Sequence, residues 1–283
     1  MTTKKENAKR LGIYLLIVFA FMLFYILCAK LMHHSNTVYY IIYMIFSFSP
    51  AIASLITRAV TKEGFLDMKL HLHLTGNIRY YLLAFGLPLI CLSAMFLLPV
   101  IVSGHADWLG GFTFGNVLSN AFLLISFSAV QSIGLLGEEL GWRGYMNQKM
   151  EPLLGTVGTC LVGGIVWGLW HLPMDIAGYL NGNGKLTEAL GSAFGRLAML
   201  TCFGAFLMWL TKKTDSVFPA VIAHFMYNES QGAVMSLLVQ GNIPEDASLP
   251  LWTDVVRYLP LLVIVVIFMI LLLKNKKKEI KTL

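Results

Sequence analysis

The sequence predicts an all-α protein that crosses a membrane several times. Of its 283 residues, 57% are hydrophobic and only 13% are charged, whereas about 25% are charged in an ordinary soluble domain. Apolar runs long enough to cross a hydrocarbon core about 30 Å thick recur along the whole chain. Lysines and arginines collect in the tails and in alternate loops, a pattern that orients helices in a membrane. These observations predict a polytopic transmembrane bundle that forms one domain over residues 1–283.

The spans follow from the lengths of the apolar runs and from breaks at charged or Gly/Asn/Pro-rich loops. The first run, from Leu11 to Leu31, has no small-residue cleavage site after it. We therefore expect it to be a spanning helix and not a signal peptide. The sequence predicts about eight spans, at residues 11–32, 38–60, 79–102, 115–137, 154–174, 188–210, 217–240 and 257–274.

The basic residues predict that both termini face the cytoplasm. Lysine and arginine collect in both tails and in the loop from Arg58 to Arg79, and Lys212 and Lys213 lie in the short sixth loop. The last loop, from Gly241 to Asp254, is acidic. Because cytoplasmic loops carry the excess of lysine and arginine, an even number of spans fits this distribution. The net charge of +6 therefore indicates membrane orientation and not nucleic-acid binding, and we expect a multi-pass protein of a cell membrane.

One predicted span differs from the others because it is partly polar. The span at residues 115–137 leads directly into Glu138 and Glu139, and Arg143 follows. A charged side chain at the centre of a bilayer helix costs roughly 2.5–3.5 kcal/mol, so ionisable residues there indicate a functional site. A polar stripe on the same span should face the bundle interior or a water-filled cavity. The stripe consists of Asn120, Ser126, Ser128, Gln131 and Ser132.

Three pairs of chemically important residues are spaced four apart, so the members of each pair share a helix face. One pair is an acid followed by a base, one is an aromatic residue followed by histidine, and one is histidine followed by asparagine. The pairs are Glu139 with Arg143, Trp167 with His171, and His224 with Asn228.

If the spans that carry these pairs adjoin, Glu138, His171, His224 and Asn228 meet in one polar pocket. A positioned carboxylate can take a proton from water, and an amide and an imidazole N–H can stabilise an oxyanion. Alternatively, Glu138, His171 and His224 could hold a divalent metal ion such as zinc, with positions left open for water. Both arrangements predict hydrolysis of a peptide bond.

Other protease chemistries lack their motifs. The sequence contains no HExxH, no GxSG and no GxGD pattern, so the common zincin helix and the usual intramembrane serine and aspartate sites are not indicated. The four cysteines lie singly in different apolar segments, which predicts neither a disulfide framework nor a thiolate metal site.

The three motifs EExxxR, aromatic-xxx-H and HxxxN, in this order on successive spans, resemble the CPBP family. This family comprises CaaX-type (type II) prenyl endopeptidases and Abi-like, bacteriocin-processing enzymes. The resemblance covers about Gly137 to Asn228 and predicts a protease-like core at about residues 115–240. Phenylalanine is common in the family at the position of Trp167, so an aromatic side chain is retained here.

The resemblance also implies roles for the residues. It implies an intramembrane endopeptidase whose substrate is a membrane-associated peptide or a lipidated protein, in CaaX-type processing, bacteriocin processing or self-immunity. It also implies the plasma membrane of a bacterium as its location, and a metal-centred version of the site remains an alternative within the family. By this resemblance, Glu138 activates water with the help of His171, His224 and Asn228 stabilise the oxyanion, and Glu139, Arg143 and Trp167 support them.

Two other classes of function remain as alternatives. A proton-coupled transporter could use Glu138, His171 and His224 as a relay, although the sequence has no evident inverted repeat, which such transporters commonly contain. A peptide-binding immunity protein could use the same fold without cleaving its ligand. The sequence makes no prediction of the oligomeric state.

Two structural expectations follow from the motif positions. The predicted span limits leave Glu138 and His171 about 10 Å apart in depth at 1.5 Å per residue. We therefore expect the helix to continue past Glu138 to about Met150, with a kink at Gly141 or Gly144, and to form a long cytoplasmic hairpin. In the following span, Gly164 and Gly168 form a small-xxx-small pair, which predicts close approach of another helix.

Overall fold

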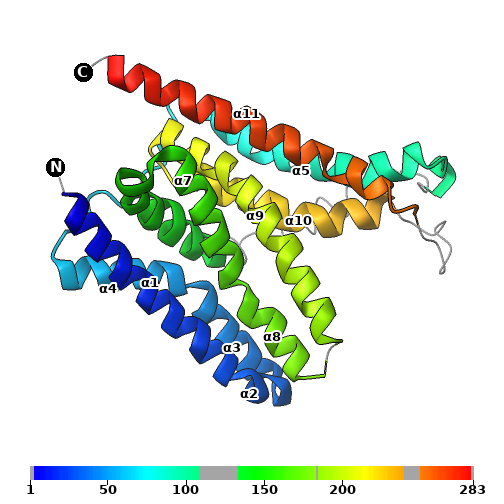
Figure 1. Cartoon of the computed structure of the whole chain (residues 1–283), viewed down its shortest axis with the longest axis horizontal. Coiled ribbons are helices and arrows are strands. Elements are labelled where there is room, and N and C mark those ends of the chain that lie inside the picture. Colours follow the sequence, from blue (N-terminus) through cyan, green and yellow to red (C-terminus); the bar gives the residue numbers. More distant parts are fainter. Residues whose placement is uncertain (1–2, 109–132, 183, 239–248, 282–283) are drawn as a thin grey trace.

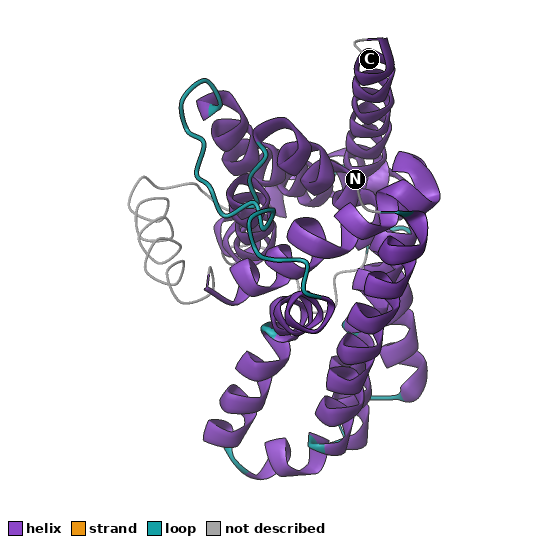
Figure 2. Cartoon of the chain, turned by 90° about the vertical axis from the view of Figure 1, so that its left-hand side faces the viewer, coloured by secondary structure: helices purple, strands orange, loops and turns teal. Residues whose placement is uncertain are grey.

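The computed structural model describes residues 3–108, 133–182, 184–238 and 249–281, and this part of the chain consists of helices and loops without a strand (Figure 2). The fold is therefore all-helical, as the sequence predicts. The helices are α1 (Lys4–Leu27), α2 (Ala29–His34), α3 (Asn36–Ser47), α4 (Ser49–Thr61), α5 (Ile78–Val102), the short η1 (Ala106–Trp108), the π-helix η2 (Trp142–Met146), α7 (Asn147–Trp170), α8 (Leu172–Leu180), α9 (Leu186–Thr214), α10 (Phe218–Leu238) and α11 (Thr253–Lys281).

Fewer spans are found than the eight predicted. Within the described residues, five helices are long and apolar enough to cross a membrane, or six if the bent pair of α3 and α4 counts as one span. The predicted span at 115–137 lies almost entirely outside the described residues. The predicted span at 217–240 corresponds to α10, which is not among these candidates because its middle, His224 to Gln231, is polar. The predicted span at 154–174 lies within a continuous stretch, Ile133–Leu180.

The helices pack in layers that place α7 and α9 at the centre. Helices α1 and α4 pack together on one side, and α1 also contacts α7. Helix α9 contacts α7 on one side and α10 and α11 on the other, and α5 packs along α10 and α11 (Figure 1). The start of α1 and the end of α11 lie on the same side of this view (Figure 1). That both termini face the cytoplasm stays a prediction.

The predicted close approach at Gly164 and Gly168 is confirmed. A Cβ atom built at Gly164 would lie 2.4 Å from the Cα of Thr201, and one at Gly168 would lie 2.7 Å from the Cα of Leu197. Both distances are shorter than any real Cβ contact, so only glycine lets α7 approach the backbone of α9 this closely.

The bend between α3 and α4 makes room for the helix that carries the two glutamates. The two helices meet at 48°, where Pro50 starts the second helix. A Cβ atom at Gly141 would lie 2.3 Å from the Cβ of Pro50, so this glycine allows the two backbones to touch. The indole Nε1 of Trp170 donates to Ser49 Oγ over 3.0 Å and ties α7 to the same bend.

The helix does continue past Glu138, as expected. Residues 133–141 are α-helical, the π-helix η2 follows, and α7 begins without a break. Gly144, one of the two predicted kink positions, lies inside η2. The helix reverses at Gly155, where φ is 69° and ψ is 176°, a conformation that is essentially restricted to glycine. The hairpin therefore exists and is slightly longer than predicted, while its location on the cytoplasmic side stays a prediction.

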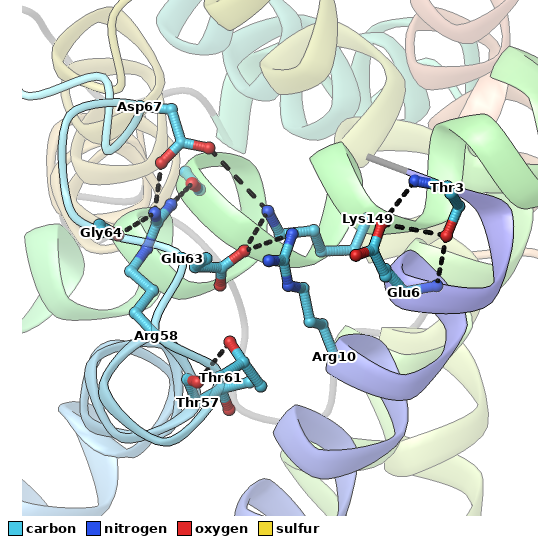
Figure 3. Close-up of polar contacts among 11 residues, drawn as sticks. Thr3, Glu6, Arg10, Thr57, Arg58, Thr61, Glu63, Gly64, Asp67 and Lys149 are labelled. Carbon is cyan, nitrogen blue, oxygen red and sulfur yellow. Dashed lines mark hydrogen bonds and ion pairs between the residues drawn. The ribbon is translucent and has the colours of Figure 1, made fainter. Parts of the chain in front are cut away.

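A partly buried ion network fastens this hairpin to the first helices (Figure 3). Glu63 pairs with Lys149 Nζ at 2.8 Å and with Arg10 Nη1 at 3.2 Å. Arg58, whose side chain is fully buried, pairs with Asp67 and donates from Nη2 to the Gly144 carbonyl over 3.4 Å. Because a π-helix departs from the usual i→i−4 bonding, a donor from α4 helps to hold η2 in place. The network thus positions the segment that carries Arg143.

Candidate active site

The hairpin brings Glu138 and Trp167 into contact although 29 residues separate them. On one straight helix that separation would amount to about 43 Å. Instead, Trp167 Nε1 donates to Glu138 Oε2 over 3.1 Å, and both residues are buried. The tryptophan therefore does more than supply the aromatic side chain that the family resemblance predicts, because its N–H also holds the carboxylate of Glu138.

Glu139 is the most strongly bonded residue of the site. Its side chain is completely buried, and its Oε1 accepts from Arg143 Nη1 over 2.9 Å. The same oxygen lies 2.9 Å from Nδ1 of His224. The local pair of Glu139 and Arg143 that the sequence predicts is present, and it extends to a histidine of α10. A buried carboxylate needs such partners because desolvation penalises an isolated charge.

The ring of Trp167 lies at the centre of the polar residues. The guanidinium carbon of Arg143 lies 4.1 Å from the ring centroid, within the range of a cation–π contact. The imidazole of His224 meets the ring edge-on with centroids 5.0 Å apart, and that of His171 lies 6.3 Å away. Residues from the hairpin and from α10 thus gather around one side chain.

His171 stands where α7 ends and α8 begins. Its Nδ1 lies 3.0 Å from the carbonyl oxygen of Trp167, and its ring packs edge-on against Trp170 at 4.8 Å. The carbonyl and the neighbouring ring hold the imidazole in one orientation. The residue is half-buried.

His224 and Asn228 differ in their surroundings although they share a face of α10. His224 is buried against Glu139 and Trp167, whereas Asn228 is exposed. Within the described part of the chain, no hydrogen bond joins Asn228 to the other predicted site residues. The structure therefore brings together Glu138, Glu139, Arg143, Trp167, His171 and His224, and it places Asn228 one helical turn beyond them.

Two contacts of this site were not predicted from the sequence. The indole N–H of Trp167 is a donor that phenylalanine lacks, so its bond to a buried acceptor was foreseeable from the residue type. The contact between Glu139 and His224 joins residues 85 positions apart and has no local pattern. The predicted polar stripe of Asn120, Ser126, Ser128, Gln131 and Ser132 lies outside the described residues.

The described residues contain no preformed metal-ligand cluster. No three His, Cys, Asp or Glu side chains among them lie close enough together to hold a metal ion. Glu138, His171 and His224, the set predicted for zinc, therefore do not fit as a ready-made site in this conformation. Zinc at these residues stays a prediction.

Comparisons with known proteins match the segment that carries the site. The family model described as type II CAAX prenyl endopeptidase Rce1-like matches residues 117–229. A curated relative, CAAX prenyl protease 2 of Methanococcus maripaludis, is 24% identical over 148 residues. That alignment covers 50% of this chain and 52% of the relative, so the chain spans about half the length of the curated relative it matches.

Proposed function

Because the chain belongs to the Rce1-like type II CAAX prenyl endopeptidase family, a family of proteases, we propose that it is an intramembrane endopeptidase. It hydrolyses a peptide bond in a membrane-associated peptide or lipidated protein. The observation that carries this proposal is the convergence of Glu138, His171 and His224 around Trp167 inside a bundle of apolar helices. Ionisable groups in such surroundings are costly and are usually functional.

The hydrogen bonds of the two histidines support roles in proton transfer. A carbonyl oxygen and a carboxylate accept hydrogen bonds, so the Nδ1 atoms of His171 and His224 carry the protons of the neutral rings. Each Nε2 is then a proton acceptor. If His224 gains a proton there, Glu139 stabilises the imidazolium, as the buried carboxylate of a Ser-His-Asp triad does.

These roles combine into a hydrolytic sequence. Glu138, assisted by His171, takes a proton from water while the water oxygen bonds to the carbonyl carbon of the substrate. The resulting oxyanion accepts hydrogen bonds from the amide of Asn228 and from Nε2–H of His224, which has taken its second proton from bulk solvent before the reaction and keeps it throughout. The C–N bond then breaks as the proton taken from water passes to the leaving amine. The substrate supplies the carbonyl and the amine, and water supplies the remaining oxygen and hydrogens.

The test uses the purified full-length protein in lipid nanodiscs with two synthetic peptides of CaaX type, one farnesylated and one without the lipid. Mass spectrometry identifies the products. We expect the wild type to cleave at least one peptide and Glu138→Gln to lose about 100-fold or more of that rate, the scale of a lost general base. Thermal unfolding of Glu138→Gln is the control for folding. Full cleavage by Glu138→Gln would refute the glutamate-dependent mechanism, whereas a wild type that cleaves neither peptide would favour one of the non-proteolytic alternatives.

Metal analysis of the same preparations separates the two versions of the site. A stoichiometric metal ion in the wild type that is lost in both His171→Ala and His224→Ala would support the zinc-centred version. Activity that survives exhaustive chelation would support water activation by Glu138.

A further inference from the structure

The last turns of α3 lie against both arms of the hairpin that carries the candidate site. On one side, the ring of Phe46 stacks on Trp170, with centroids 4.5 Å apart and planes 3° from parallel, and Trp170 packs edge-on against His171. On the other side, a Cβ atom at Gly134, one turn before the first glutamate, would lie 3.7 Å from the Cβ of Ser47. This end of α3 therefore forms part of the wall around the site.

Tyr43 lies on this wall, one turn before Ser47 and on the same face of α3. Its hydroxyl group shares a hydrogen bond with the side chain of Ser47 and interacts electrostatically with the carboxylate of Glu138. A Cβ atom at Gly137 would lie 2.9 Å from the ring of Phe48, so the hairpin comes closest beside Glu138 at the point where α3 ends. The bond to Ser47 thus directs the hydroxyl group of Tyr43 toward the end of α3 at which Glu138 lies.

Tyr43 and Glu138 differ in their exposure to solvent. Glu138 is 6% exposed, whereas Tyr43 is 36% exposed, and the ring of Tyr43 stacks along that of Tyr39 with centroids 5.9 Å apart. The phenol is therefore a restrained polar group that is more accessible than the carboxylate beside it. A water molecule bound to Glu138 needs such a second partner if it is to be held in one orientation.

We propose that Tyr43 is a further catalytic residue, whose phenolic oxygen accepts a hydrogen bond from the water that Glu138 deprotonates. The inference rests on the proposed endopeptidase function and deepens it. With one hydrogen of the water bonded to Glu138 and the other to Tyr43, a lone pair of the water oxygen is free to attack the carbonyl carbon of the substrate. Glu138 takes the first hydrogen, and the second stays on the oxygen that enters the new carboxyl group. Tyr43 meanwhile donates its own hydrogen to Oγ of Ser47, so it neither gains nor loses a proton.

Tyr43→Phe removes the hydroxyl group and keeps the ring. In the nanodisc cleavage assay, we expect kcat to fall about tenfold, the scale of one ordinary hydrogen bond. The KM for the farnesylated peptide and the midpoint of thermal unfolding should stay at the wild-type values. Tyr40→Phe is the matched control, because it removes the same group from the same helix at a side chain that is 65% exposed. Its kcat should equal that of the wild type.

A second substitution distinguishes orientation of the water from packing of α3. Ser47→Ala removes the hydrogen-bond partner of the phenol, so by itself it should lower kcat several-fold. In the Tyr43→Phe background it should have no further effect, because two residues that act through one hydrogen bond give a non-additive result. Independent effects of the two residues on packing would multiply instead.

Three outcomes would overturn the proposal. A wild-type kcat in Tyr43→Phe would show that the hydroxyl group does not contact the reacting water. A lower midpoint of unfolding in Tyr43→Phe, or losses that multiply in the double variant, would assign the hydroxyl group to packing. A wild type that cleaves neither peptide would refute the endopeptidase function and this role with it, whereas the first two outcomes arise in an active enzyme and leave that function intact.

Discussion

Glu138 and Glu139 are adjacent in the sequence, but their side chains have different surroundings. Glu138 accepts one bond, from Trp167. Glu139 binds both Arg143 and His224 and is completely shielded from solvent. The motif predicts a catalytic role for Glu138 and a supporting role for Glu139. These contacts are compatible with both roles, which can be tested by substitution.

Glu139→Gln should damage both folding and activity. The variant keeps the size of the side chain but leaves Arg143 buried without its carboxylate, a loss of about 3–5 kcal/mol for a buried ion pair. It also removes the negative charge beside His224. We expect a lower midpoint of thermal unfolding and a loss of cleavage, measured in the same detergent. Glu138→Gln should lose cleavage with a much smaller change in unfolding, and equal destabilisation of the two variants would contradict these roles.

Trp167→Phe should have a moderate effect. Phenylalanine preserves an aromatic ring near Arg143 and His224 but cannot donate to Glu138. One lost hydrogen bond to a buried acceptor is worth about 1–3 kcal/mol. We expect kcat to fall about tenfold while KM for the farnesylated peptide changes little. A wild-type rate would mean that the indole N–H does not position Glu138 during the reaction.

Among the structural elements, the hairpin from residue 133 to Trp170 positions most of the residues of the candidate site. Its reversal at Gly155 sets Glu138 beside Trp167, and its π-helical stretch carries Arg143. Glycines then allow the hairpin to pack closely, at Gly141 against Pro50 and at Gly164 against Thr201. The site is therefore built mainly on helices, which hold side chains more precisely than loops do.

Gly164→Ala should loosen the packing of α7 on α9. The new Cβ atom would lie 2.4 Å from a backbone atom of Thr201, so one helix must shift, at a cost of about 1–3 kcal/mol. We expect a lower midpoint of thermal unfolding and lower activity. Gly178→Ala is the control, because nothing lies within 4 Å of its new methyl group. A Gly164→Ala protein as stable as this control would contradict the close approach.

At the scale of the whole molecule, the charge distribution predicts the orientation in the membrane. The basic residues predict that both termini face the cytoplasm, and the start of α1 and the end of α11 lie on one side of the structure (Figure 1). An epitope tag at either end should resist added protease in right-side-out vesicles and become sensitive after permeabilisation. Digestion of one tag in intact vesicles would show that the termini lie on opposite sides.

The amino-acid sequence by itself predicted the all-helical class, the resemblance to the CPBP family and the candidate residues for the chemistry. Helix-long apolar runs require a membrane-like environment, and charges inside them stand out because they are costly there. The sequence also indicated the hairpin and the close approach at Gly164 and Gly168, because spacing and side-chain size act locally. Five or six of the eight predicted spans are found among the described residues, because the span at 115–137 lies almost entirely outside them and polar residues lower the hydropathy of α10.

Only the tertiary structure decided which groups touch. The contact of Glu139 with His224, the bond from Trp167 to Glu138 and the stacking of Phe46 on Trp170 all join residues from distant segments. Such contacts depend on how the bundle packs as a whole, and periodicity along a single helix carries no information about them. For the same reason Asn228, which shares a helix face with His224, lies apart from the bonded residues in a more exposed position.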